Sequence, residues 1–193
     1  MGLLDVILGR RKPKRAASDR LFAIVTAQLM LETELGLRHR GAAGVVFKPL
    51  GTAEFGEVTR DLDELLQSTG NETGTEMRRE DDEFGYRWTI LVDDDFEDLV
   101  TSLNAVSESL EANGYSEQLL CAVLAFEETT PKAKGEPVYW IYNYKRAAFY
   151  PFAPRRDRER DLERELRLRS LLARELPLEQ EPERWFPLWD IPL

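Results

Sequence analysis

Eight consecutive apolar residues, LLCAVLAF at positions 119–126, constrain the fold more than any other stretch of this chain. Successive side chains of a β-strand point to opposite faces of the sheet, so this segment presents apolar side chains on both. Such a strand requires a sheet that is covered on both faces. The run is far shorter than the roughly 20 apolar residues that span a bilayer. We therefore predict a central strand here, with Cys121 as a small, inert core residue.

Four further strands are predicted around this one. They cover residues 44–49, 84–92, 138–144 and 148–152. Residues 84–92 place every second residue, from Phe84 to Val92, on one apolar face. The last two strands are close enough in sequence to form a hairpin. Pro151 has no amide hydrogen to donate, so the second strand of this hairpin is expected at an edge of the sheet.

Apolar residues spaced three and four apart predict four helices. These helices cover residues 18–35, 52–66, 95–113 and 157–176. The first three begin at side chains that can cap free helical amides, namely Ser18 or Asp19, Thr52 and Asp95. The fourth carries i,i+4 charge pairs, including Glu165 with Arg169, and this charged face is expected in solvent. The polar stretch 70–82 predicts a surface loop.

Together these elements predict an α+β fold, in which helices pack on a largely antiparallel sheet. The domain organisation expected is an apolar and basic arm at 1–17, one α+β domain at 18–176 and a tail at 177–193. Trp185, Phe186 and Trp189 lie in this tail. Large aromatic side chains are costly to leave in water, so we expect the tail to pack on the domain. The alternative is an exposed peptide that docks on a partner through these three residues.

Few residues of the chain point to chemistry. The single histidine, His39, is expected in an exposed loop, and one histidine with one cysteine cannot form a common catalytic triad or zinc site. Asp93, Asp94 and Asp95 could hold a divalent cation, but Asp95 directly precedes an amphipathic helix, which favours a cap. We therefore assign no catalytic, cofactor-binding or metal-binding residues. An enzyme that depends on carboxylates stays open as an alternative.

The charge of the chain is unevenly distributed. Formal net charge is −10, yet residues 1–15 carry +4, which leaves −14 for the rest. The basic residues are Arg10, Arg11, Lys12, Lys14 and Arg15. Leu3, Leu4, Ile7 and Leu8 would share one side of a helix. This arm is therefore expected to contact either an anionic membrane surface or a protein.

Nucleic acid is a weaker candidate partner. Aromatic residues of 138–144 could stack on bases, but such residues mostly fill cores. The arginines near 155–160 alternate with acidic residues, and the body of the chain is acidic. No nucleic-acid partner is expected. The lone cysteine forms no internal disulfide, which fits a cytoplasmic protein.

Several segments together resemble one family. They are MGLLD with the basic run after it, NAVSESLEANGYSEQLLCAVLAF, YNYKRAAFYPFAP and RWFPLW. They are similar to the phage-shock-protein-A-associated protein, type B. The resemblance implies a non-enzymatic adaptor or regulator in a membrane stress response, with a PspA-like coiled-coil partner and a place at the inner face of the membrane. It implies no catalytic residues. A looser similarity, at the level of fold alone, is to type III secretion chaperones.

Overall fold

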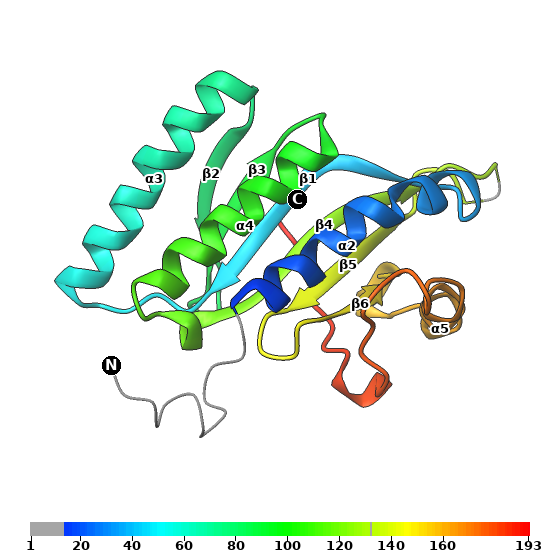
Figure 1. Ribbon diagram of the computed structural model, residues 1–193. Helices are drawn as coiled ribbons and strands as arrows, with labels where there is room; N and C mark the ends of the chain where they lie inside the picture. Colours follow the sequence, from blue (N-terminus) through cyan, green and yellow to red (C-terminus); the bar gives the residue numbers. More distant parts are fainter. Residues whose placement is uncertain (1–13, 132) are drawn as a thin grey trace, which may run out of the picture.

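The computed structural model describes residues 14–131 and 133–193, with side chains from Arg20 onward. Its strands form one antiparallel sheet in the order β2-β3-β1-β4-β5-β6 (Figure 1). The strands are β1 (Leu37–Phe47), β2 (Glu76–Asp81), β3 (Arg87–Val92), β4 (Leu119–Glu128), β5 (Pro137–Asn143) and β6 (Ala148–Phe152). The helices are α2 (Lys14–Thr33), α3 (Ala53–Thr73), α4 (Phe96–Ala112) and α5 (Leu162–Leu171), with 3-10 turns at Ser116–Gln118, Arg156–Arg158 and Pro182–Arg184. The predicted α+β class is confirmed.

The chain path from β1 to β4 is β-α-β-β-α-β. Helix α3 connects β1 to β2 with β3 between them, and α4 connects β3 to β4 with β1 between them. This is the split βαβ arrangement of ferredoxin-like domains. The β5–β6 hairpin extends the sheet beside β4, and Pro151 lies in the edge strand β6, as predicted. The looser similarity to type III secretion chaperones stays a prediction.

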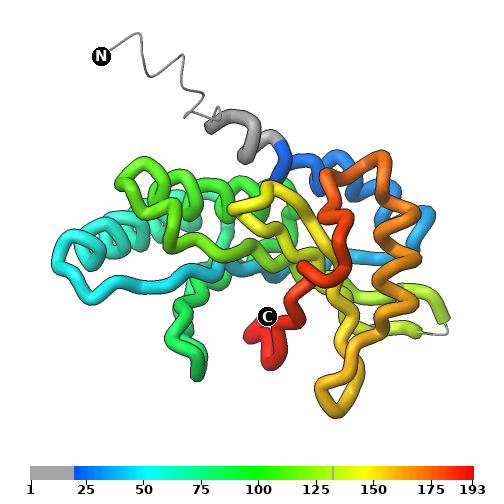
Figure 2. The backbone as a smooth tube through the Cα atoms, turned by 90° about the horizontal axis from the view of Figure 1, so that it is seen from below, coloured from blue at the N-terminus to red at the C-terminus, as the bar shows by residue number. Residues whose placement is uncertain are grey.

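Helices α2, α3 and α4 cover one face of the sheet (Figures 1 and 2). Helix α5 packs at the β6 edge, where Leu168 and Leu172 join the same core. On the other face, Trp185 and Trp189 of the C-terminal segment pack against the sheet. Strand β4 therefore lies between two cores. Its residues Ala122, Val123, Leu124 and Phe126 have no exposed surface, which confirms the central strand.

Two predicted helix caps are present. The hydroxyl of Thr52 accepts a hydrogen bond from the amide of Phe55 at 3.3 Å. The carboxylate of Asp95 accepts from the amides of Glu97 and Asp98, at 2.9 and 3.1 Å. Each contact satisfies amides that have no partner inside the helix. Helix α2 differs from its prediction, because it starts at Lys14 and not near Ser18.

The predicted loop at 70–82 is wrong. Helix α3 continues to Thr73, and residues 76–81 form the edge strand β2. Strand β3 pairs with one side of the β2 backbone, and the side chains of β2 are mostly exposed. An edge strand that is exposed to solvent on both faces does not need alternating apolar and polar residues. Its charged side chains disfavour pairing with strands of other chains. Composition alone therefore suggested a loop.

His39 does not lie in an exposed loop. It belongs to β1, is half-buried, and its ring lies 5.0 Å from the ring of Phe96. Gly41, with φ of 65°, breaks the register of β1 just after it. This bulge interrupts the apolar pattern, and the strand therefore looked shorter in the sequence.

Strand β3 and helix α5 both begin later in the chain than the sequence predicted. Strand β3 begins at Arg87, so Phe84 lies in a turn and is 71% exposed. Helix α5 begins only at Leu162. The expectation that its charged face is solvated is wrong for Glu165, whose side chain has no exposed surface. An ion pair with Arg160 compensates this burial.

Candidate docking site

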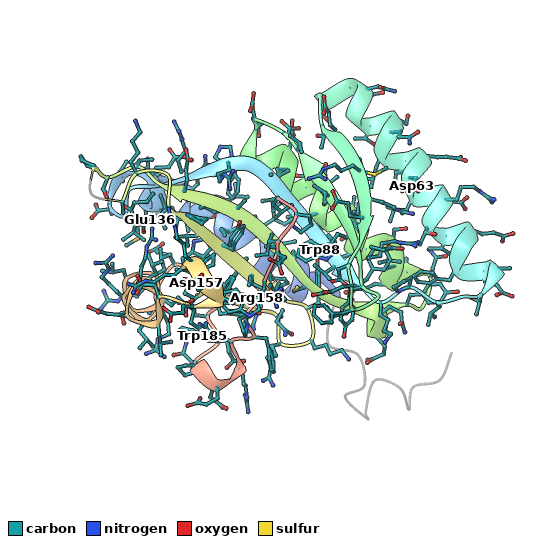
Figure 3. All side chains as sticks on the ribbon, turned by 180° about the vertical axis from the view of Figure 1, so that it is seen from behind. Asp63, Trp88, Glu136, Asp157, Arg158 and Trp185 are labelled. Carbon is teal, nitrogen blue, oxygen red and sulfur yellow. The ribbon has the colours of Figure 1, made fainter. Side chains whose placement is uncertain are left out.

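A pocket of about 540 Å³ lies on the sheet face opposite α2, α3 and α4. The β2–β3 hairpin forms one wall and the C-terminal segment forms the other. The lining residues come mainly from 80–88, from Val46, Leu120 and Cys121 of the sheet, and from 187–192 of the C-terminal segment. Figure 3, seen from behind, shows the C-terminal segment crossing the sheet near Trp88 and Arg158.

The hairpin wall is held in place by Asp82. One oxygen of its carboxylate accepts hydrogen bonds from the amides of Phe84 and Tyr86, both at 2.9 Å. The other oxygen accepts from the indole nitrogen of Trp88 at 3.2 Å. One carboxylate thus orients three aromatic residues of the pocket. Phe84 stays exposed at its mouth, while Trp88 is buried in its floor.

The opposite wall is anchored by Trp185. This side chain is 2% exposed, stacks on Tyr150, and donates from its indole nitrogen to the carbonyl of Glu179 at 3.2 Å. The hydroxyl of Tyr150 donates to the carbonyl of Phe186 at 3.0 Å. Further along, Trp189 lies edge-on to Phe152, with 5.2 Å between ring centroids. These contacts fix the segment on the sheet.

Arg160 connects the same segment to α5. Its guanidinium donates to the carbonyl of Trp185 at 2.8 Å and pairs with the carboxylate of Glu165 at 2.6 Å. Glu165 also accepts from the amide of Ala153 at 2.9 Å. Burial raises the pKa of Glu165, and the hydrogen bonds from Arg160 and Ala153 oppose that rise. The pair therefore joins β6, α5 and the C-terminal segment.

Negative charge surrounds the mouth of the pocket. Five carboxylates and one guanidinium line it, from Glu80, Asp81, Asp82, Glu83, Asp190 and Arg158. A hydrogen bond from Arg87 is the largest influence on Asp81 and lowers the pKa of that carboxyl. Arg158 and Asp190 pair at 2.5 Å across the mouth, and Glu80 pairs with Arg78. Glu83 has no ion-pair partner within the part of the chain that the structure describes.

The backbone near this mouth is strained. Asp157, Arg158 and Asp190 have φ values of 62°, 55° and 55°. This region costs a residue with a β-carbon about 1–2 kcal/mol, and less for an aspartate, whose short side chain can hydrogen-bond locally. Strain of this kind concentrates at functional sites, where the surrounding structure maintains it. Its presence on both sides of the Arg158–Asp190 pair marks this end of the pocket as a candidate site.

A second pocket of about 240 Å³ adjoins the first and shares Leu120, Cys121 and Leu188 with it. It extends toward Lys145 and Phe186. We call the two pockets together the tail groove. Burial raises the pKa of the Cys121 thiol to about 12, so the thiol is protonated at neutral pH. The tail groove therefore offers apolar and aromatic walls beneath an acidic rim, which suits binding more than nucleophilic catalysis.

The three aromatic residues predicted for partner docking have different places. Trp185 is buried, Trp189 is half-buried and lines the first pocket, and Phe186 is 61% exposed beside the second. Sequence reasoning missed Phe84 and Asp82. Their signal was the acidic run before an aromatic alternation, REDDEFGYRW, which is typical of a tight turn entering a strand.

The predicted N-terminal contact residues lie largely outside the described residues. These are Leu3, Leu4, Ile7, Leu8, Arg10, Arg11 and Lys12. Lys14 and Arg15 form the start of α2. Within residues 14–131 and 133–193 we find no helix with the length and hydrophobicity that a bilayer crossing requires. Among the same residues, no three His, Cys, Asp or Glu side chains cluster in a way that can hold a metal ion.

Comparison with known proteins gives one match. A family model described as PspAB, PspA associated protein B, matches residues 1–193. No curated protein and no solved structure matches the chain.

Proposed function

Since the chain belongs to the PspA associated protein B family, we propose that it is a non-enzymatic adaptor or regulator that binds a PspA-type coiled-coil protein during membrane stress. The observation that carries this proposal is the family match over residues 1–193, because the family is named for association with PspA.

The tail groove is the docking surface that we propose for this partner. An amphipathic helix binds a groove by placing aliphatic side chains against apolar walls. Phe84 and Trp189 supply such walls above a floor formed by Trp88, and the carboxylates at the mouth suit flanking lysine or arginine residues. The groove therefore favours a partner segment that is both apolar and basic. Phe84 is the best-placed anchor, because it is large and 71% exposed.

Peripheral contact with the inner face of the membrane completes the proposal. The five basic residues of 10–15 can each contribute about 1 kcal/mol beside an anionic leaflet. The acidic body offsets part of this attraction. Contact of this strength is reversible, which suits a regulator. Binding of the protein to anionic vesicles should weaken with salt and disappear when residues 1–15 are removed.

Calorimetric titration with the PspA-type protein encoded in the same genome tests partner docking. Phe84→Ala and Glu83→Lys should each weaken binding about tenfold, a change of roughly 1.4 kcal/mol. The matched controls are Leu65→Ala and Glu57→Lys on α3, where both side chains are exposed on the opposite face. Controls should bind like the native protein. Absence of any binding by the native protein contradicts the function, and equal losses in variants and controls contradict the docking surface.

A further inference from the structure

We infer that the first 13 residues of the chain bind in its own tail groove, so that arm and groove mask each other until a competitor separates them. The inference concerns the groove of the proposed function, but it requires no PspA-type partner. The argument uses the chemistry of the arm, the acidic rim of the groove and the position at which α2 begins.

The apolar chemistry of the two parts matches. The arm contains five aliphatic residues within six positions, namely Leu3, Leu4, Val6, Ile7 and Leu8. The first pocket has aromatic and aliphatic walls, with a volume of about 540 Å³. A pocket of this size holds a few side chains of a peptide, since ligand sites range over roughly 300–1,000 Å³. Occupation by the arm would also cover Phe84, which is 71% exposed.

The charges of the two parts also match. Arg10 and Arg11 follow the aliphatic residues within three positions. Five carboxylates line the pocket that would receive Leu3 to Leu8. Three of them, Glu80, Asp81 and Asp190, already pair with arginines, whereas Glu83 has no ion-pair partner among the described residues. Basic residues that flank the bound segment would therefore reach this rim. Residues 1–13 carry +2, from Arg10, Arg11 and Lys12 against Asp5, and the rest of the chain carries −12, so long-range attraction favours the encounter.

The arm also starts at the correct end of the groove. Arg20 of α2 donates to the carbonyl of Ala147 at 3.3 Å, which places the first turns of α2 beside the β5–β6 turn. Lys145 of that turn lines the near end of the groove. Leu8 and Leu3 lie six and eleven positions before Lys14, which corresponds to about 20 and 38 Å of extended chain. Since the arm is tethered, its effective concentration near the groove is about millimolar.

Cys121 provides a direct reporter of occupancy. It is the single cysteine of the chain, and it lines both pockets of the groove. The experiment compares, at pH 9, the rate at which a small neutral disulfide reagent modifies Cys121 in the full chain and in a chain without residues 1–13. Burial raises the pKa of this thiol to about 12, so both reactions are slow and the ratio of the two rates is the measured quantity. We expect at least a tenfold faster reaction after deletion. A synthetic peptide of residues 1–15 should restore protection.

Matched variants separate groove binding from a general loss of structure. In the full chain, Leu4→Asp with Leu8→Asp should accelerate modification while circular dichroism stays unchanged. In the chain without residues 1–13, the peptide of residues 1–15 should no longer protect Cys121 when Phe84→Ala or Glu83→Lys is introduced. It should still protect Cys121 in the Leu65→Ala variant. Equal modification rates with and without the arm would overturn the inference. Protection that grows with protein concentration would also overturn it, because the arm would then bind a second copy.

The two proposals can fail separately. If the arm does not protect Cys121, but Phe84→Ala still weakens binding of the PspA-type protein, only the masking of the groove by the arm is rejected. Protection by the arm, without any binding of the PspA-type protein even to the chain that lacks residues 1–13, rejects only the proposed function.

Discussion

Arg160 and Glu165 pair at 2.6 Å, and the carboxylate of Glu165 has no exposed surface. The same guanidinium donates to the carbonyl of Trp185 at 2.8 Å. One residue thus links α5 to the segment that forms a wall of the tail groove. Removing one partner of a buried pair is costly, because the other charge stays in a poorly solvated site.

Glu165→Gln should therefore lower the free energy of unfolding by about 2–4 kcal/mol, less than for a fully buried pair because Arg160 is 22% exposed. Urea denaturation measures this change. Glu163→Gln is the control on the same helix, where the side chain is exposed and the effect should stay within about 0.5 kcal/mol. Equal stability of the two variants would show that the pair contributes little.

Asp161 should make α5 sensitive to acid. Burial alone would raise the pKa of Asp161, but the amide of Arg164 and the guanidinium of Arg155 outweigh it and lower the pKa below 3.8. Its contribution to stability is therefore present above pH 3.8 and is lost as pH falls through the folded-state pKa. Asp161→Asn keeps the cap but removes the charge. Denaturation from pH 7 to 3 should show the difference from native protein shrinking in acid, and a constant difference contradicts the assignment.

Trp185 and Phe186 are neighbours with opposite environments. Trp185→Ala should cost about 3–5 kcal/mol, because it leaves a cavity beneath the C-terminal segment. Phe186→Ala should cost less than about 0.5 kcal/mol, since the side chain is exposed. Deleting residues 183–193 should lower the melting temperature by several degrees. Thermal melts measure all three, and an unchanged melt after the deletion would contradict packing of the segment.

Asp95 and Asp94 offer a second matched pair. Asp95→Ala removes the acceptor for two helical amides and should cost about 1 kcal/mol. Asp94 is exposed and caps no helix, so Asp94→Ala should change stability very little. If both variants unfold at the same urea concentration, the capping role of Asp95 is wrong.

Gly41 tests the bulge in β1. Its φ is 65°, and a β-carbon there would lie 2.9 Å from the backbone oxygen of Asp93. Gly41→Ala should therefore cost at least about 1–2 kcal/mol. Gly51 has no neighbour within 4 Å of that position, so Gly51→Ala should leave stability unchanged or slightly higher. Hydrogen exchange at β1 amides would show whether any loss is local to the bulge.

Some of the fold follows from local pattern. The run LLCAVLAF requires cover on both faces, and β4 is the buried strand between β1 and β5. Thr52 and Asp95 cap helices because their side chains reach amides two or three residues away. The β5–β6 hairpin needs only a short turn. In each case the interacting groups are close in sequence, or the residue type permits only one environment.

Other features depended on residues far apart in the chain. Strand β2 is a strand because β3 pairs with it, and its own side chains are too polar to indicate this. Glu165 is buried because Arg160 and the amide of Ala153 compensate its charge, although its spacing on α5 suggested a solvated face.

The tail groove also shows which features follow from the sequence and which depend on the tertiary structure. The sequence by itself determined that Trp185, Phe186 and Trp189 are costly to expose, but it did not determine which of them would be buried. Packing on Tyr150 and Phe152 decided that. The groove forms only where residues 80–88 and 187–192 meet on one face of the sheet, about a hundred positions apart. Side-chain chemistry is a local property, whereas a concave surface exists only after the sheet has paired.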